Sequence, residues 1–274
     1  MSTLVRFGPD ERLVGVLSGS ATAKGPILVL PSAGLVPRTG PFRLHVELAE
    51  RLASQGMRTF RFDAPGVGEA PRIPGMADVE ATLAALDHLA LHHGGERFVV
   101  GGICAAADVG WRAAVDDERV VAMLMLDGLA FSGPWFHLAR ITNAFRRGPS
   151  SWLGIAKRIF GRAGGGLDRR FEIADYREWP SPTQARAEFA GLVRNGKRSL
   201  WIYTGGYVDV FLHPRQFDWS FGASSSASCV EMEFWPDCDH TFFATPHRMR
   251  LLDRIERWLL SMEPTGPAAL EQRA

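Results

Sequence analysis

The sequence contains few cysteines, no long apolar run and no marked excess of either charge. Its three cysteines, Cys104, Cys229 and Cys238, are too few for a disulfide framework in 274 residues, which favours a reducing compartment. No apolar run approaches a membrane span, and residues 1–10 lack a signal-peptide pattern, so we expect a cytoplasmic protein. The 31 basic residues nearly match the 30 acidic ones, which gives no indication of nucleic acid or an anionic membrane as a partner.

The sequence does contain short apolar runs that alternate with amphipathic segments. This pattern predicts an α/β protein with a mostly parallel eight-stranded sheet flanked by helices. The first two runs lie close together and predict an antiparallel hairpin. The eight runs are residues 4–7, 13–17, 26–30, 57–62, 98–101, 120–126, 200–203 and 230–235.

The alternation fails for about seventy residues after the sixth predicted strand. We therefore expect a helical cap over residues 129–197, inserted between strands six and seven. The core would then comprise residues 1–128 and 198–262, and residues 263–274 would form a flexible tail.

The most informative segment, residues 98–107, leads from a predicted strand through Cys104 into a predicted helix. Gly102 lies two residues before Cys104, and Ala106 lies two residues after it. Both are small, which is what a tight turn between a strand and a helix requires. The pattern resembles the nucleophile elbow Gly-x-Ser-x-Gly, with Cys for Ser and Ala for the second Gly. Such a turn exposes the sulfur at the carboxyl edge of the sheet and at a helix N-terminus, which lowers a thiol pKa. The competing interpretation is that Cys104 is simply a small, buried hydrophobic side chain with no catalytic role.

The partners of this nucleophile are expected at the same sheet edge. His240 follows the last predicted strand and precedes the closing helix, where the chain order of nucleophile, acid and histidine places the base. For the acid we prefer Asp209, in the loop after residues 200–203, over Asp127, directly after residues 120–126. Backbone N–H groups of Ala33 and Ala105 are the candidate oxyanion hole.

Residues 40–70, which read GPFRLHVELAERLASQGMRTFRFDAPGVGEA, carry a family resemblance together with the elbow. From Pro26 to the last helix, the chain resembles the α/β-hydrolases associated with exosortase systems. The basic aromatic stretch at residues 152–158 also resembles a segment of that family. The loop at residues 205–208 and the turn at residues 64–66 depart from the family pattern. The resemblance implies an α/β-hydrolase fold and a cysteine nucleophile.

These features together predict acyl transfer through a thioester on Cys104. The substrate would be an ester or thioester of a small molecule or an acyl carrier, and the reaction would need no cofactor and no metal. Either an acyltransferase with the same intermediate or a non-catalytic binding protein is the alternative. Aromatic and basic residues of the cap are candidates for an acyl pocket with a basic rim: Trp135, Phe136, Phe145, Arg146, Arg147, Trp152, Lys157, Arg158 and Phe160.

Overall fold

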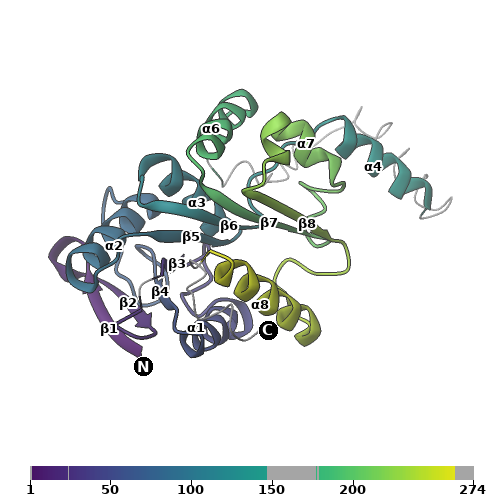
Figure 1. Ribbon diagram of the computed structural model, residues 1–274. Coiled ribbons are helices and arrows are strands. Elements are labelled where there is room, and N and C mark those ends of the chain that lie inside the picture. The colour runs from purple at the N-terminus through teal and green to yellow at the C-terminus, as the bar shows by residue number, and fades with distance from the viewer. Residues whose placement is uncertain (1, 24, 147–176, 178, 263–274) are drawn as a thin grey trace, which may run out of the picture.

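The computed structural model of the protein describes residues 2–23, 25–146, 177 and 179–262. Their centre is an eight-stranded sheet (Figure 1). Its strands are β1 (Ser2–Phe7), β2 (Leu13–Ser18), β3 (Ile27–Pro31), β4 (Arg58–Phe62), β5 (Phe98–Ile103), β6 (Val120–Leu126), β7 (Arg198–Thr204) and β8 (Val230–Trp235). Each coincides with one of the eight predicted runs to within a few residues.

The strand order in the sheet is β1-β2-β4-β3-β5-β6-β7-β8. The β1–β2 pair is the predicted antiparallel hairpin, and β2 also runs antiparallel to β4. The pairs from β4 through β8 are parallel, so the expected mostly parallel sheet is confirmed. Parallel neighbours require a crossover, and their carboxyl ends share one edge of the sheet.

Helices cover both faces of the sheet (Figure 1). Helices α1 (Leu44–Ser54) and α8 (Thr245–Leu260) pack on one face, and α2 (Asp78–His93), α3 (Ala105–Asp116), α6 (Pro182–Arg194) and α7 (Arg215–Phe221) pack on the other. Short 3-10 helices lie at Pro9–Glu11, Pro41–Arg43 and Gly222–Ser226. The segment containing α7 had no predicted helix.

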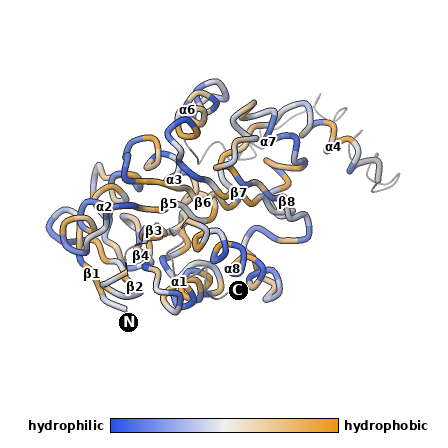
Figure 2. The backbone as a smooth tube through the Cα atoms, viewed as in Figure 1, coloured by the Kyte–Doolittle hydropathy of each residue, from blue (hydrophilic) through white to orange (hydrophobic). Residues whose placement is uncertain are grey.

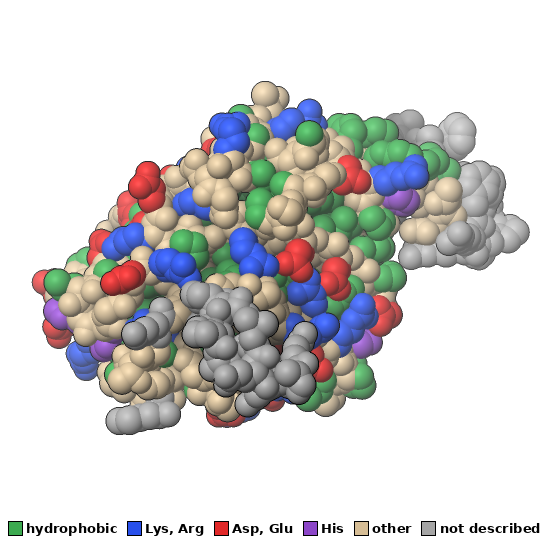
Figure 3. All heavy atoms as spheres, in the orientation of Figure 1, with side chains coloured by type: hydrophobic (Ala, Val, Ile, Leu, Met, Phe, Trp, Pro, Cys, Tyr) green, Lys and Arg blue, Asp and Glu red, His purple; other side chains and the backbone are tan. Residues whose placement is uncertain are grey.

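The central strands are apolar on both faces because each face is covered by helices. In β3, Val29 contributes to the core on the α2 and α3 side, whereas Leu28 and Leu30 contribute to the core on the α1 and α8 side. This explains why these strands appear in the sequence as continuous apolar runs rather than alternating ones. Figure 2 shows the same concentration of hydrophobic residues in the sheet, and Figure 3 shows acidic and basic side chains interspersed over one face.

The region predicted as a cap is divided in the structure. Helix α4 (Pro134–Arg146) extends away from the sheet (Figure 1), with Trp135 stacked on the His213 ring at 5.4 Å. Helix α6 instead packs on the sheet, with Phe189 fully buried in the core beside α3 and α7. The range 129–197 therefore includes a core helix, because α6 supplies the crossover into β7. Residues 147–176 of the predicted cap and the predicted tail lie outside the described residues.

Two glycines at the end of β5 allow the strand to approach its neighbours closely. Gly101 has φ 149°, and a Cβ added there would lie 2.0 Å from the carbonyl oxygen of Leu124 in β6. Gly102 has φ 147°, and its added Cβ would lie 3.0 Å from the Cβ of Ala106 in α3. Both backbone conformations strain any residue with a side chain. Only at Gly101 is the obstacle a rigid backbone atom.

These two neighbouring glycines form a matched pair for a stability test. We expect Gly102→Ala to lower the free energy of unfolding by about 1–3 kcal/mol, the usual cost of a strained backbone conformation. Gly101→Ala should cost more, because β6 must also move away from β5. Urea unfolding of both variants measures the difference. A Gly101→Ala variant as stable as Gly102→Ala would contradict the steric account.

Candidate active site

Cys104 occupies a strained turn between β5 and α3. Its φ of 58° and ψ of −119° are rare for a residue with a side chain, and it is the N-cap residue of α3. The Cys104 N–H donates to the Leu126 carbonyl at 2.8 Å, which ties the turn to the end of β6. The side chain is partly exposed. The sulfur is thus held at the carboxyl edge of the sheet beside the positive end of a helix dipole.

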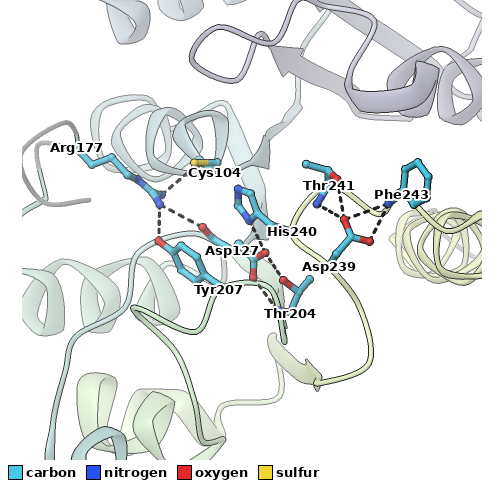
Figure 4. A network of polar contacts seen from close by, with 9 residues as sticks. All are labelled: Cys104, Asp127, Arg177, Thr204, Tyr207, Asp239, His240, Thr241 and Phe243. Carbon is cyan, nitrogen blue, oxygen red and sulfur yellow. Dashed lines mark hydrogen bonds and ion pairs between the residues drawn. The ribbon is translucent and has the colours of Figure 1, made fainter. Parts of the chain in front are cut away.

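His240 lies beside Cys104 although it comes from the loop after β8 (Figure 4). Its Nδ1 is 2.7 Å from Oδ2 of Asp127, and its imidazole lies between that carboxylate and the Cys104 side chain. The Tyr207 ring stacks on the imidazole with a centroid distance of 5.6 Å. His240 is therefore oriented by one hydrogen bond and one aromatic contact.

A glycine in the loop after β7 lets this loop pack against the one that carries His240. A Cβ added to Gly206 would lie 2.3 Å from the His240 backbone nitrogen. The Gly206 N–H donates to the carbonyl of Cys238 at 3.0 Å. The sequence Gly205-Gly206 permits the close approach that places Tyr207 over the imidazole.

Asp127 is fully buried, and other groups hold both of its carboxylate oxygens. Oδ1 accepts a hydrogen bond from the Thr204 N–H at 2.7 Å, and Oδ2 accepts one from the Thr204 hydroxyl at 2.6 Å in addition to the His240 contact. Thr204 is the last residue of β7. Because these donors fix the carboxylate in one orientation, it in turn fixes the imidazole.

The carboxylate bound to His240 is therefore that of Asp127 and not that of Asp209, which corrects the preferred sequence assignment. Asp127 directly follows β6, the strand next to β5, so its side chain emerges beside the elbow. Asp209 lies beyond the turn after β7 and is exposed, while Val210 and Phe211 after it are buried. Within the described part of the chain, Asp209 makes no hydrogen bond with His240.

Hydrogen bonds and charges favour the ionised forms of Cys104 and His240. Burial alone would raise the thiol pKa, but interaction with His240 and the positive charge of Arg177 lower the pKa of Cys104 below its ordinary value. Burial opposes a charged imidazole too, but Asp127 and Cys104 together raise the pKa of His240 to about 9. Both shifts favour a thiolate that faces an imidazolium.

The two candidate oxyanion donors differ in their surroundings. The N–H of Ala105, at the start of α3, hydrogen-bonds to the side chain of Cys104. The N–H of Ala33 donates to the carbonyl of Val36 at 3.1 Å in a small turn after β3. Both N–H groups are therefore engaged in the structure, and the predicted use of Ala33 as an oxyanion donor stays a prediction.

Three residues near the site were not predicted: Thr204, Tyr207 and Arg177. Thr204 and Tyr207 flank the double glycine after β7. The end of a strand next to a tight turn was therefore the sequence signal that could have indicated these two residues. Arg177 belongs to the irregular segment before α6, where no periodicity indicates which side chain turns inward. Its guanidinium is buried, and one of its N–H groups donates to the Cys104 carbonyl at 3.0 Å.

Metal-ligand chemistry occurs once among the residues with described coordinates. Donor atoms of Asp237, Cys238 and His247 all lie within 4.8 Å of one another. Asp237 is already paired with Arg250 at 3.4 Å, and neither Cys104 nor His240 belongs to this group. The arrangement at Cys104 itself brings together a thiol, an imidazole and a buried carboxylate.

No protein-family model and no curated protein matches the sequence. Solved structures do match. An esterase from Pyrococcus furiosus superposes with a TM-score of 0.62 at 13% identity, over 96% of this chain and 92% of that one. An α/β hydrolase from Penicillium sp. gives a TM-score of 0.57 at 15% identity, with 96% and 99% coverage. A monoacylglycerol lipase from Paleococcus ferrophilus gives 0.53 at 16% identity, with 92% and 99% coverage. The chain has the α/β-hydrolase fold.

An α/β-hydrolase fold places ligands at the carboxyl edge of its sheet, where Cys104, Asp127 and His240 meet. The chain order here is cysteine, aspartate, histidine, and catalytic sites typical of the fold have the order nucleophile, acid, histidine. None of the helices with described coordinates combines the length and the apolar character needed to cross a bilayer.

The Asp127–His240 contact makes a spectroscopic prediction. We expect Asp127→Asn to lower the pKa of His240 from about 9 toward its ordinary value, because the amide carries no charge. NMR titration of the imidazole protons measures this pKa. Asp209→Asn is the matched control and should leave it unchanged. A fall with Asp209→Asn but not with Asp127→Asn would restore the original assignment.

Proposed function

We propose that the protein is a hydrolase that cleaves an ester or thioester through Cys104, His240 and Asp127. The observation that carries the proposal is the row in Figure 4, in which a buried carboxylate orients an imidazole beside a thiol on a strained elbow. Strained backbone conformations such as that of Cys104 cluster at active sites and ligand-binding sites. A non-catalytic binding protein would not need a raised histidine pKa next to a lowered cysteine pKa.

The proposed reaction proceeds in two steps. The Cys104 thiolate attacks the acyl carbonyl, and the Ala105 N–H stabilises the developing oxyanion at the start of α3. The imidazolium of His240 protonates the leaving alcohol or thiol, and an acyl-cysteine remains. Neutral His240 then takes a proton from water, which attacks the thioester and releases the acid. Asp127 keeps the imidazole oriented and stabilises its charge in both steps.

Two kinds of similarity support this assignment. The solved structures with this fold include an esterase and a monoacylglycerol lipase. The sequence resemblance to exosortase-associated hydrolases favours a cysteine nucleophile. The three cysteines are free thiols, which supports our proposal of a cytoplasmic, reducing location.

Removal of the thiol is the direct test of the nucleophile. Cys104→Ala should abolish hydrolysis of a p-nitrophenyl ester, and Cys104→Ser should retain little activity because a hydroxyl has a much higher pKa than a thiol. In the wild type, intact-protein mass spectrometry of the quenched reaction should detect one acyl group, which peptide mapping assigns to Cys104. Turnover by Cys104→Ala at the wild-type rate would refute the proposal.

Two matched controls accompany this experiment. Cys229→Ala and Cys238→Ala should keep wild-type rates, because neither thiol contacts His240. Adding an amine or thiol acceptor to the assay then reveals where the acyl group goes. A main product that carries the acceptor, even in excess water, would change the assignment from hydrolase to acyltransferase.

The pKa of His240 also predicts the alkaline limit of activity. For an alkyl ester, whose leaving group needs a proton, kcat/KM should fall as the pH rises past about 9, where the imidazolium is lost. The acidic limb should follow the thiol, so both limbs describe the coupled pair. A p-nitrophenyl ester has a leaving group that needs no proton and should show a weaker alkaline fall. Equal alkaline limbs for the two esters would contradict proton donation by His240.

A further inference from the structure

The mechanism above leaves one buried charge beside the nucleophile unused, that of Arg177. Its side chain is only 5% exposed. The guanidinium forms an ion pair with Asp108, through Nε and through an Nη2 hydrogen bond of 2.6 Å. Its other N–H groups donate to the Cys104 carbonyl at 3.0 Å, to the Asp127 carbonyl at 3.3 Å and to the hydroxyl of Tyr207.

These contacts connect Arg177 to all three members of the proposed triad (Figure 4). The two carbonyls belong to Cys104 and Asp127, and the third acceptor, Tyr207, has its ring stacked on His240. A planar guanidinium with donors in fixed directions is suited to such a junction, and a lysine ammonium is not. Arg177 holds the strained Cys104 turn by its carbonyl, whereas Leu126 holds it by its N–H.

The partner of Arg177 is also fixed in place. Asp108 lies in the first turn of α3, and its Oδ2 accepts a hydrogen bond from the Trp179 indole at 2.9 Å. The Arg177 guanidinium in turn lies 4.8 Å from the centre of the Trp179 ring. Burial leaves little water to screen either charge. The charge of Arg177 lowers the pKa of the Cys104 thiol, and the paired charge of Asp108 offsets part of the charge of Arg177.

We propose that Arg177 and Asp108 form a positioning pair for Cys104, in which the guanidinium braces the elbow and favours the thiolate while the carboxylate limits that effect. The proposal deepens the proposed function and rests on Cys104 as the nucleophile. The charged and titratable groups that interact with the Cys104 thiol are His240, Arg177 and Tyr207. Asp127 and Asp108 are the carboxylate partners of His240 and Arg177. Tyr207 stays neutral, because burial raises its pKa far above the ordinary value.

The test exploits the opposite charges of the pair. Arg177→Gln should raise the pH midpoint of Cys104 alkylation by iodoacetamide, and Asp108→Asn should lower it, each by about one pH unit. The double variant should fall between the single ones. Peptide mass spectrometry separates Cys104 from the other two thiols. If the pair were purely structural, both single variants would shift the alkylation midpoint in the same direction. That outcome, or no shift of the midpoint in either variant, overturns the proposal.

Three controls complete the design. Arg112 lies in α3, as Asp108 does, and pairs with Glu188 of α6 at 3.1 Å. Arg112→Gln removes this charge and should leave the pH midpoint of Cys104 alkylation unchanged. Arg177→Lys keeps the positive charge but loses the several N–H donors of the planar guanidinium. Its alkylation midpoint should therefore stay near that of the wild type while kcat falls. If Arg177→Gln fails to fold, the direction of the Asp108→Asn shift decides alone. Alkylation does not require turnover, so inactive wild-type protein would refute the hydrolase proposal and leave this result interpretable.

Discussion

The strained conformation of Cys104 is the constraint on which the site depends. A residue with φ 58° and ψ −119° persists only where its surroundings hold it, and here β6 binds its N–H while Arg177 and the first turn of α3 bind its carbonyl. The turn also requires the small residues Gly102 and Ala106 on its two sides. Ala106 satisfies the pattern because Gly102 opposite it has no Cβ, so the departure from a second glycine does not widen the turn.

Much of the fold was predictable because the central strands of the sheet are buried on both faces. The runs around Val29, Val100 and Leu124 are apolar at every position, which only a strand covered on two sides requires. The helix α6 was misjudged as cap because its apolar residues, such as Phe189, recur with the same spacing whether the helix covers the sheet or a lid. Periodicity indicates that a helix has a buried face, but not what covers it.

The site was predictable where chemistry follows from position along one strand, and not where it follows from the packing of loops. Cys104 directly follows β5, and His240 lies in the loop between β8 and the closing helix, both of which the sequence defines. The choice between Asp127 and Asp209 depended on which carboxylate turns toward the imidazole. The hydroxyl and N–H of Thr204 decide this by binding Asp127, while the turn after β7 leaves Asp209 in solvent. The Ala33 turn is a similar case, because the hydrogen bond from its N–H to Val36 depends on loop packing that the sequence does not indicate.

The charges at the site alternate in sign from Asp108 through Arg177, Cys104 and His240 to Asp127. Because every ion in this row has an opposite neighbour, burial can be tolerated without neutralising the thiolate. The alternation also fits a two-step reaction. In the proposed reaction, Cys104 loses its negative charge when it becomes acylated, and His240 gives its proton, and with it its positive charge, to the leaving group in the same step. The net charge of the row is therefore unchanged, so the fixed ions at its two ends need not rearrange between attack and hydrolysis.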